Sequence, residues 1–370
     1  MQDVKCNIDR ENNPFEFYVA GDHLDSEDLT IRRRGRFSTD DVGPAFVRKF
    51  TAGQILYGSR RTYLKKVAVA DFDGICANTT FVFESKNPSL FDQRLLPFLI
   101  LSDNFTKWSI SHSKGSTNPY ILFSDLAEFE FDLPSLADQK KLADKLWATY
   151  RLKESYKKLL ASMDELVKSR FMEQFIIGTP YERKSLGDYI SQVRGVSYKP
   201  KDLRSSLSED SVLLLRANNI SSGVINHDEV QYVAKGKVSA TQILQTGDIL
   251  ICASSGSLEH VGKAAICFSS IVGETFGAFC KLIRTNGALL PEYIAAYLKT
   301  DEYREIIMQL ACGSNINNLK TEHIDNLQIP VPPIDVQESF VSFVRQLDKS
   351  KLELQKSIAA IDDVIKSLIN

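Results

Sequence analysis

A cluster of basic side chains is the strongest candidate for binding chemistry. Ten lysines and arginines lie between Arg32 and Lys66, against two acidic residues, in a chain whose net charge is −2. Arginine forks match guanine edges and phosphates, and Tyr57 and Tyr63 are interleaved with them. We therefore expect DNA contacts here, and the candidate residues are Arg32, Arg34, Arg36, Arg60 and Arg61. A solvated charged face is the alternative interpretation.

Polar loops carry further side chains that can bind base edges or phosphates. Serine and asparagine do so in DNA-binding proteins, although in loops they more often form turns. The candidates are Lys114, Ser116 and Asn118 in the first half, and Arg216, Asn218, Asn219, Ser254, Ser255, Ser314, Asn315 and Asn317 in the second. The whole chain has no positive excess, so a nucleic-acid partner would depend on such local groups.

Patterns typical of catalytic centres are missing or incomplete. Residues 256–263 resemble a phosphate-binding loop, but the gap is one residue too long, and Ala264 stands where Ser or Thr must bind magnesium. Two Asn-Pro triplets each lack one proline of the adenine methyltransferase motif, and no Gly-x-Ser-x-Gly elbow occurs. The cysteines and histidines have no zinc-site spacing. We expect a binding protein without catalytic residues, metal or cofactor.

Length and composition indicate an ordinary globular protein. A chain of 370 residues suggests two or three domains, and 43% hydrophobic with 25% charged residues excludes wholesale disorder. The longest fully apolar run has seven residues, far below the ~20 that span a bilayer. The start of the chain has no apolar leader, so we expect a cytoplasmic location. The six cysteines are interpreted as buried thiols of a reducing compartment.

The chain contains an internal duplication with a period near 200 residues. Residues 134–139 and 332–337 share a proline and a glutamine five positions apart, and they are offset by 198 residues. The same offset relates Gly115-Ser116 to Gly313-Ser314, whereas Gly53-Gln54-Ile55-Leu56 matches Gly247-Asp248-Ile249-Leu250 at an offset of 194. Such a period is too long for a solenoid repeat and indicates a duplicated domain.

A heptad stripe follows each Pro-to-Gln motif and predicts two helices of about 35 residues. The first stripe comprises Leu142, Leu146, Thr149, Lys153, Tyr156, Leu160, Met163 and Val167, and the second Phe340, Val344, Leu347, Lys351, Leu354, Ile358, Ile361, Ile365 and Leu368. Residues 135–138 and 335–338 have the spacing of capping boxes, and Gly178 with Pro180 is expected to end the first helix.

These two helices are expected to pair with each other. Helices of this length with a narrow apolar stripe need another helix as partner, although two amphipathic helices packed on their own domains are the alternative. Two copies of one unit related by a pseudo-twofold axis must pair antiparallel. Lys153 and Lys351 then lie near the middle of the seam, where a polar residue can fix the register.

Each half is predicted to be an α+β domain that ends in its long helix. Short β-like runs occur at residues 15–20, 66–69, 79–83, 212–215, 248–251 and 263–268, and helical segments are predicted at 95–104 and 291–309. The predicted fold is therefore α+β: two similar globular domains (1–134 and 180–334), separated by two long antiparallel helices (135–179 and 335–370) that form a pseudo-twofold coiled coil.

The chain resembles the DNA-specificity subunit of bacterial type I restriction-modification enzymes over essentially its whole length. The motifs that carry the resemblance are residues 53–68 and 72–76, Leu186-Gly187-Asp188, residues 215–220 and 247–250, and both Pro-to-Gln motifs. Gln54 departs from the acidic residue of the family's Gly-Asp-Ile-Leu motif. The first half also lacks a counterpart of Leu186-Gly187-Asp188, so its first domain begins differently.

The resemblance implies two target-recognition domains, each reading a short half-site in a major groove of double-stranded DNA. The long helices would set the gap between half-sites, because about 50 Å of helix corresponds to about 15 base pairs. It also implies that two methyltransferase subunits dock one per half, hold S-adenosylmethionine and flip the target adenine. An endonuclease and translocase subunit would join for cleavage, and this chain would catalyse nothing.

Three alternatives remain open from the sequence. The chain could serve a related two-gene restriction system whose partner both cleaves and methylates DNA. It could be a coiled-coil adaptor with no DNA role, for which the near-neutral charge is the best argument. It could also be an enzyme with an unrecognised site, which binding of S-adenosylmethionine by the isolated chain would favour.

Overall fold

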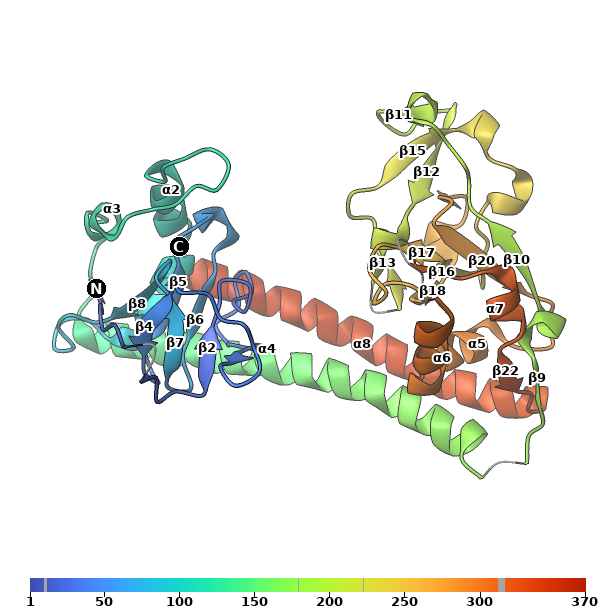
Figure 1. Cartoon of the computed structure of the whole chain (residues 1–370), viewed down its shortest axis with the longest axis horizontal. Helices are drawn as coiled ribbons and strands as arrows, with labels where there is room; N and C mark the ends of the chain where they lie inside the picture. The colour runs from blue at the N-terminus through green and yellow to red at the C-terminus, as the bar shows by residue number, and fades with distance from the viewer. Residues whose placement is uncertain (10–11, 179, 222, 312–316) are drawn as a thin grey trace. The chain divides into compact units, whose positions relative to one another are not determined.

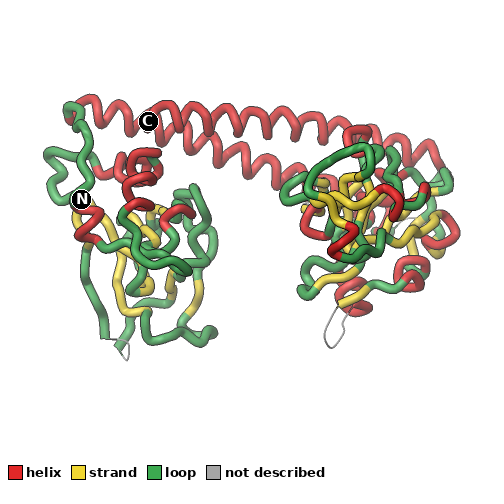
Figure 2. Tube along the Cα trace, turned by 90° about the horizontal axis from the view of Figure 1, so that it is seen from above, coloured by secondary structure: helices red, strands yellow, loops and turns green. Residues whose placement is uncertain are grey.

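The computed structural model describes residues 1–9, 12–178, 180–221, 223–311 and 317–370 (Figure 1). Contacts divide the chain into two compact units. Unit 1 comprises Met1–Lys157 and Gln355–Asn370, and unit 2 comprises Lys158–Leu354. Each unit combines β-sheets with helices (Figure 2), so the α+β class predicted from the sequence is confirmed.

Unit 1 contains two four-stranded sheets. The first has the order β1-β8-β5-β6 and is antiparallel throughout, and the second has the order β3-β2-β7-β4. Their strands are β1 (Gln2–Asp3), β2 (Phe17–Val19), β3 (Gly35–Arg36), β4 (Phe46–Phe50), β5 (Ile55–Gly58), β6 (Val67–Val69), β7 (Gly74–Ala77) and β8 (Thr80–Glu84). The central strands β5 and β7 are almost wholly buried, which explains their continuous apolar sequence.

Unit 2 contains two four-stranded sheets and three short two-stranded ladders. The four-stranded sheets have the orders β10-β20-β16-β18 and β11-β15-β12-β19. The strands are β9 (Arg183–Ser185), β10 (Ile190–Arg194), β11 (Leu203–Arg204), β12 (Ser211–Leu215), β13 (Ile220–Ser221), β14 (Val224–Ile225), β15 (Gln231–Ala234), β16 (Ile249–Cys252), β17 (Ser254–Ser255), β18 (Ala264–Ile266), β19 (Thr275–Phe276), β20 (Cys280–Thr285), β21 (Asn317–Asn318) and β22 (Gln328–Pro330). All six β-like runs of the sequence contain strands.

The first sheet of unit 1 and the first sheet of unit 2 are the same structure repeated. Leu56 pairs with Val82 in unit 1, and its counterpart Leu250 pairs with Leu282 in unit 2. Strand β1 takes the edge position beside β8 that β10 takes beside β20. The duplication is therefore visible in strand register as well as in sequence.

The unusual Gln54 has a matching change across the sheet. In unit 2, Asp248 accepts hydrogen bonds from Arg284 Nε and Nη2 at 2.7 and 2.6 Å. The corresponding pair in unit 1 is Gln54 and Glu84, where Gln54 Nε2 donates to Glu84 Oε2 at 3.0 Å. In unit 1 the carboxylate therefore stands at the position of Arg284, and an amide donor, Gln54, stands at the position of Asp248.

Each predicted short helical segment is two helices rather than one. In unit 1, α1 (Leu96–Leu101) and α2 (Asp103–Ser111) meet at Ser102, whose hydroxyl accepts from Phe105 N at 3.3 Å. In unit 2, α5 (Pro291–Tyr297) and α6 (Asp301–Ala311) meet near Thr300, whose hydroxyl accepts from Tyr303 N at 3.2 Å. A hydroxyl that caps a new helix breaks the apolar pattern at the same place in both halves. Two single-turn helices complete the set, α3 (Phe123–Ala127) and α7 (Thr321–Asp325).

Two 36-residue helices follow, α4 (Leu136–Phe171) and α8 (Ile334–Ile369). Ser135 caps α4 as predicted, because its hydroxyl accepts from Asp138 N at 3.2 Å. The corresponding expectation for α8 is wrong: α8 begins before Asp335, which therefore lies in the first turn, where a carboxylate favours the helix dipole. A π-helical turn (Met172–Ile176) precedes Gly178, which has a φ of +64° and ends the helical segment.

The glutamine of each Pro-to-Gln motif is buried and makes three hydrogen bonds to the backbone. Gln139 is 1% exposed; its Oε1 accepts from Asp92 N, and its Nε2 donates to the carbonyls of Leu90 and Pro134. Gln337 makes the same three bonds in unit 2, and its partners are Leu290 N and the carbonyls of Ala288 and Pro332. Every partner is displaced by the same 198 residues. The motif therefore ties the start of each long helix to the loop before α1 or α5.

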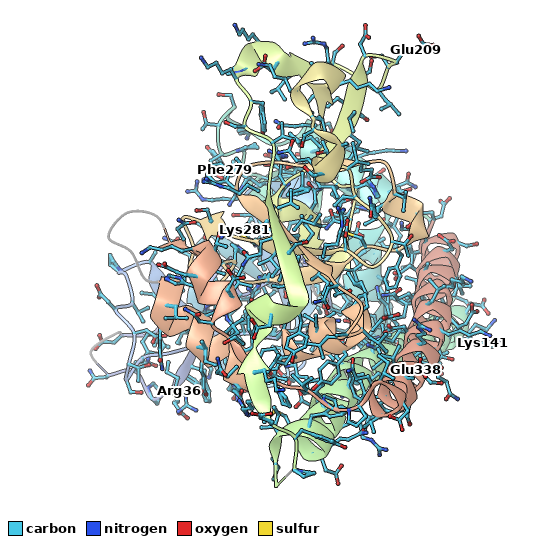
Figure 3. The ribbon with its side chains drawn as sticks, turned by 90° about the vertical axis from the view of Figure 1, so that its right-hand side faces the viewer. Arg36, Lys141, Glu209, Phe279, Lys281 and Glu338 are labelled. Atoms are coloured by element: carbon cyan, nitrogen blue, oxygen red, sulfur yellow. The ribbon has the colours of Figure 1, made fainter. Side chains whose placement is uncertain are left out.

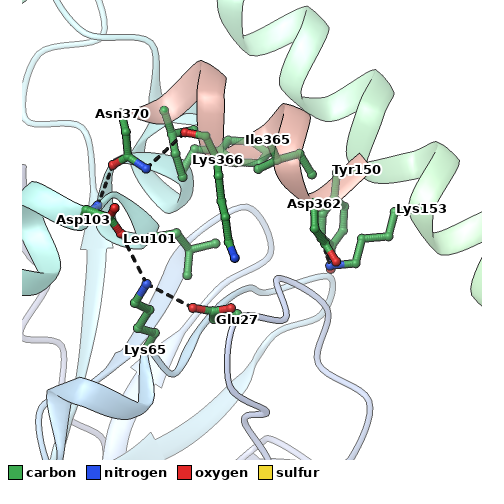
Figure 4. Close-up of a pocket in the computed structure, with 12 residues that line it drawn as sticks. Glu27, Lys65, Leu101, Asp103, Tyr150, Lys153, Asp362, Ile365, Lys366 and Asn370 are labelled. Atoms are coloured by element: carbon green, nitrogen blue, oxygen red, sulfur yellow. Dashed lines mark hydrogen bonds and ion pairs between the residues drawn. The ribbon is translucent and has the colours of Figure 1, made fainter. Parts of the chain in front are cut away.

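The predicted seam residues are all buried or half-buried on α4 and α8. Within unit 1, Ile361 and Ile365 of α8 share a core with Leu146 and Tyr150 of α4. Lys153 Nζ donates to Asp362 Oδ1 at 2.5 Å in this unit (Figure 4). Within unit 2, Lys351 Nζ donates to Asp164 Oδ1 at 2.6 Å, so both polar seam positions have a carboxylate partner.

The expectation of six buried thiols is corrected at one position. Cys76, Cys252, Cys267 and Cys280 are buried and unpaired, but Cys6 is exposed. Burial raises the pKa of Cys76 to about 12 and that of Cys252 to about 11, which disfavours their reactive thiolate forms. Cys312 lies outside the described residues.

Candidate nucleic-acid interface

The turn that follows β5 presents Arg60 and Arg61 to solvent. A short 3-10 helix (Thr62–Leu64) forms the turn, and the flanking residues Arg61 and Lys65 have φ values of +50° and +48°. Left-handed conformation in a residue other than glycine costs on the order of 1 kcal/mol and tends to occur at functional sites. Tyr63, between them, is 53% exposed. Neither Arg60 nor Arg61 makes an ion pair with a described residue, so both guanidinium groups are available.

A second loop packs beside this turn and brings further candidates to the same edge. Arg61 N donates to the Pro119 carbonyl at 2.6 Å, and Arg60 forms an isolated antiparallel bridge with Tyr120. Lys114 also bridges to Tyr120. The exposed residues gathered here are Arg60, Arg61, Tyr63, Lys114, Ser116, Asn118 and Tyr120, and we call this set edge 1.

Unit 2 forms the corresponding edge with different side chains. Strand β17 pairs with β21, so that Ser254 lies opposite Asn318 and Ser255 opposite Asn317. The Ser254–Asn318 pair corresponds to Arg60–Tyr120 in the duplication. Neighbouring backbone bonds repeat too, because Ile121 N donates to Ser59 O and Leu319 N donates to Ala253 O. We call Ser254, Ser255, Phe279 and Asn318 edge 2.

Edge 2 is less basic than edge 1. Ser254 Oγ donates to Asn318 Oδ1 at 3.1 Å, and Phe279 beside it is 63% exposed (Figure 3). Lys281 lies two residues further, but it is 8% exposed, and its Nζ donates to Thr321 Oγ1. Burial, with the nearby Arg194 charge, lowers the pKa of Lys281. Edge 2 therefore presents hydroxyl, amide and aromatic groups, whereas edge 1 combines such groups with two arginines and a lysine.

Several predicted residues lie elsewhere. Arg32 is held by Asp28 at 2.7 Å and Glu154 at 2.6 Å, so two carboxylates neutralise it. Arg34 stacks over Phe17, 3.8 Å from the ring centroid, and Arg36 pairs with Glu16. These three arginines are not part of edge 1.

The Arg216 loop is a structural turn. Asn219 is 0% exposed; its Oδ1 accepts from Arg216 N, and its Nδ2 donates to Asp228 O. Asn219 is therefore corrected from a candidate DNA contact to a buried turn residue, while Asn218 next to it is exposed. Ser314 and Asn315 lie outside the described residues, and of Asn317 only the backbone pairing is described.

Sequence reasoning missed the two exposed aromatic residues Tyr120 and Phe279. The 198-residue offset carries Tyr120 onto Asn318, at the end of a loop already considered, so the duplication could have found Tyr120. No sequence signal singles out Phe279, because only the fold places it beside Ser254.

Among the described residues, no group of three or more His, Cys, Asp or Glu side chains could hold a metal ion. Within the same residues, no helix combines the length and apolar character needed to cross a membrane.

Residues 25–162 and 209–361 match the sequence model of one family, described as "Type I restriction modification DNA specificity domain". One match lies in each half of the duplication.

Curated relatives match part of the chain well and the whole chain weakly. The specificity subunit of the type I restriction enzyme StySPI from Salmonella potsdam is 35% identical over 171 residues, or 44% of this chain and 36% of the relative. The chain thus matches about a third of that relative's length. The MjaVIII specificity subunit from Methanocaldococcus jannaschii is 20% identical over 320 residues, or 80% of this chain and 73% of the relative.

A solved structure shares the fold. The S subunit of a type I restriction-modification system from M. genitalium superposes with a TM-score of 0.54 at 14% identity, covering 100% of this chain and 91% of that one.

Proposed function

Because the chain belongs to the family of type I restriction modification DNA specificity domains, we propose that it is the subunit that gives such a system its sequence specificity. Its ligand is double-stranded DNA with two separated half-sites. One recognition domain (1–134) reads one half-site, and the other (180–334) reads the second.

The observation that carries this proposal is the equivalence of edge 1 and edge 2. The same backbone pairing positions Arg60 opposite Tyr120 in unit 1 and Ser254 opposite Asn318 in unit 2. One scaffold therefore presents two different sets of hydrogen-bonding side chains, as a protein needs if it reads two different short sequences.

The long helices act as the spacer between the half-sites. Helices of 36 residues are about 54 Å long at 1.5 Å per residue, or about 16 base pairs. The Lys153–Asp362 and Lys351–Asp164 pairs support an antiparallel arrangement, because each lysine of one helix meets an aspartate of the other. The spacer segments are 135–179 and 335–370.

The chemistry of modification and cleavage belongs to partner subunits. Two methyltransferase subunits dock one per half and hold S-adenosylmethionine, and an endonuclease and translocase subunit joins them. This chain contributes no catalytic residue, and the complex works on cytoplasmic DNA.

The test is DNA binding by the chain assembled with its methyltransferase subunits. The double substitution Arg60→Ala/Arg61→Ala should weaken binding about tenfold or more and reduce the salt dependence, because two phosphate or base contacts are lost. Lys140→Ala/Lys141→Ala is the matched control: it removes the same charge from exposed positions of unit 1 and should leave affinity unchanged. Equal losses in both variants, or none in the first, would refute a role for edge 1.

A further inference from the structure

One strip of unit 1, residues 129–134, lies outside its strands, and no described strand pairs with it. Residues 129–134 correspond to residues 327–332 of unit 2, where β22 pairs antiparallel with β9. Ile329 faces Lys184 in that ladder and is 0% exposed, whereas its counterpart Phe131 is 43% exposed. Within the described part of unit 1, no strand covers this strip as β9 covers β22.

An apolar cavity lies next to this strip. Its volume is about 160 Å³, and it is lined among others by Leu95, Phe131, Leu133, Leu142 and Ile369. An apolar cavity of about 150 Å³ is large enough to hold benzene. The cavity therefore has room for one aromatic ring.

Unit 2 holds an aromatic ring at the corresponding place. Phe175 is 1% exposed, and its ring centroid lies 4.9 Å from that of Tyr293, 5.3 Å from Phe340 and 5.1 Å from Phe171. The counterparts of these three neighbours in unit 1 are Leu95, Leu142 and Ile369, which all line the cavity. The positions that surround the Phe175 ring in unit 2 therefore surround an open cavity in unit 1.

The charge of the strip indicates which kind of segment would pair with it. Glu128, Glu130 and Asp132 are exposed, and none makes an ion pair with a described residue. Their counterparts Asn326, Gln328 and Pro330 are uncharged. The strand that covers Gln328–Pro330 carries Arg183 and Lys184, and its register places Arg183 opposite Pro330, the counterpart of Asp132. Opposite charges across paired strands are favourable, so the acidic strip suits a basic strand.

We propose that this groove of unit 1 binds an extended, basic segment of a partner subunit. The segment adds a strand along residues 130–132 and places an aromatic side chain in the cavity, as β9 and Phe175 do within unit 2. Only the choice of partner, a subunit of the restriction complex, rests on the proposed function.

The groove can be tested with a peptide whose sequence is residues 174–187 of this chain, labelled with fluorescein. The full chain should bind it, and a peptide with Phe175→Ala should bind about tenfold more weakly because the ring is lost. The chain variant Glu130→Lys/Asp132→Lys changes exposed residues and should weaken binding about tenfold. A peptide with Arg183→Glu/Ser185→Glu should regain affinity for that variant, because in the β22–β9 register these two positions lie opposite the counterparts of residues 132 and 130. Such a rescue fixes the register of pairing.

Several results would overturn the proposal that this groove binds a basic segment. They are no binding of the peptide, equal binding of the Phe175→Ala peptide, or no rescue by charge exchange. DNA affinity of the Glu130→Lys/Asp132→Lys variant should equal that of the parent, which separates this result from any failure at edge 1.

The source of the segment is tested by a photo-crosslinking amino acid at position 131 in the chain co-expressed with its methyltransferase and endonuclease subunits. Crosslinks to a basic, aromatic-containing segment of one of those subunits would support the proposal. Crosslinks only within this chain, or only to a second copy of it, would contradict the partner assignment.

Discussion

Lys153 and Asp362 form an ion pair whose duplicate is the pair of Lys351 and Asp164. The Nζ–Oδ1 distances are 2.5 and 2.6 Å, and each residue maps onto its counterpart by 198 positions. In both pairs the lysine side chain is largely covered, with 12% and 15% of its surface exposed. Both polar positions of the predicted seam therefore have a carboxylate partner, and polar residues at such positions can specify the register of paired helices.

Reversing the charge of one partner tests this register. Lys153→Asp should lower the free energy of unfolding of unit 1 by about 1–3 kcal/mol, because two carboxylates then meet in the seam. Lys153→Asp/Asp362→Lys should recover most of that loss. Both tryptophans, Trp108 and Trp147, lie in unit 1, so their fluorescence during urea unfolding reports on this unit. A double variant no more stable than the worse single variant would show that the two residues do not interact.

The hydrogen bond between Gln54 and Glu84 across the first sheet of unit 1 gives a second prediction. Gln54→Asp restores the family-like acidic residue but places it beside Glu84, so it should destabilise unit 1 by about 1–2 kcal/mol. Adding Glu84→Arg recreates the Asp248–Arg284 pair and should restore stability. Gln54→Asn is the control, since it shortens the side chain without adding charge. If Gln54→Asp alone proves neutral in tryptophan-detected unfolding, the two positions are not coupled.

Asp28 predicts a pH dependence. Burial alone would raise the pKa of Asp28, but hydrogen bonds from Arg32, Thr30 N and Tyr150 Oη hold it below the usual value. The folded chain therefore binds fewer protons there than the unfolded chain, and the stabilisation is present above about pH 4 and lost as pH falls through the lower folded pKa. Asp28→Asn should cost about 1–3 kcal/mol at pH 7. That difference should shrink at pH 3, and a constant difference would contradict the assignment.

The sequence was sufficient for the features that depend on local pattern. The heptad stripes predicted the long helices, and the repeated Pro-to-Gln motif predicted equivalent halves, because both signals lie within short segments. The stripe also singled out Lys153 and Lys351. It did not predict their partners Asp362 and Asp164, because these two residues are not among its core-spaced positions.

Features that depend on distant contacts were beyond sequence reasoning. Arg32 counts as a free charge in the sequence, but Glu154, 122 positions away, neutralises it. Arg60 and Tyr120 meet only because two loops close against one sheet edge. Ser102 looks like an ordinary polar residue in an apolar run, and its role as a cap appears only when the chain turns there.

One measurement tests directly whether the long helices set the gap between the half-sites. Seven residues inserted after Tyr156 and seven after Leu354 lengthen both helices by about 10 Å, or about three base pairs. Co-expressed with its methyltransferase subunits, this variant should methylate a site with the same two half-sites and an untouched gap about three base pairs longer, as read by long-read methylome sequencing. Methylation at the original gap would contradict the account.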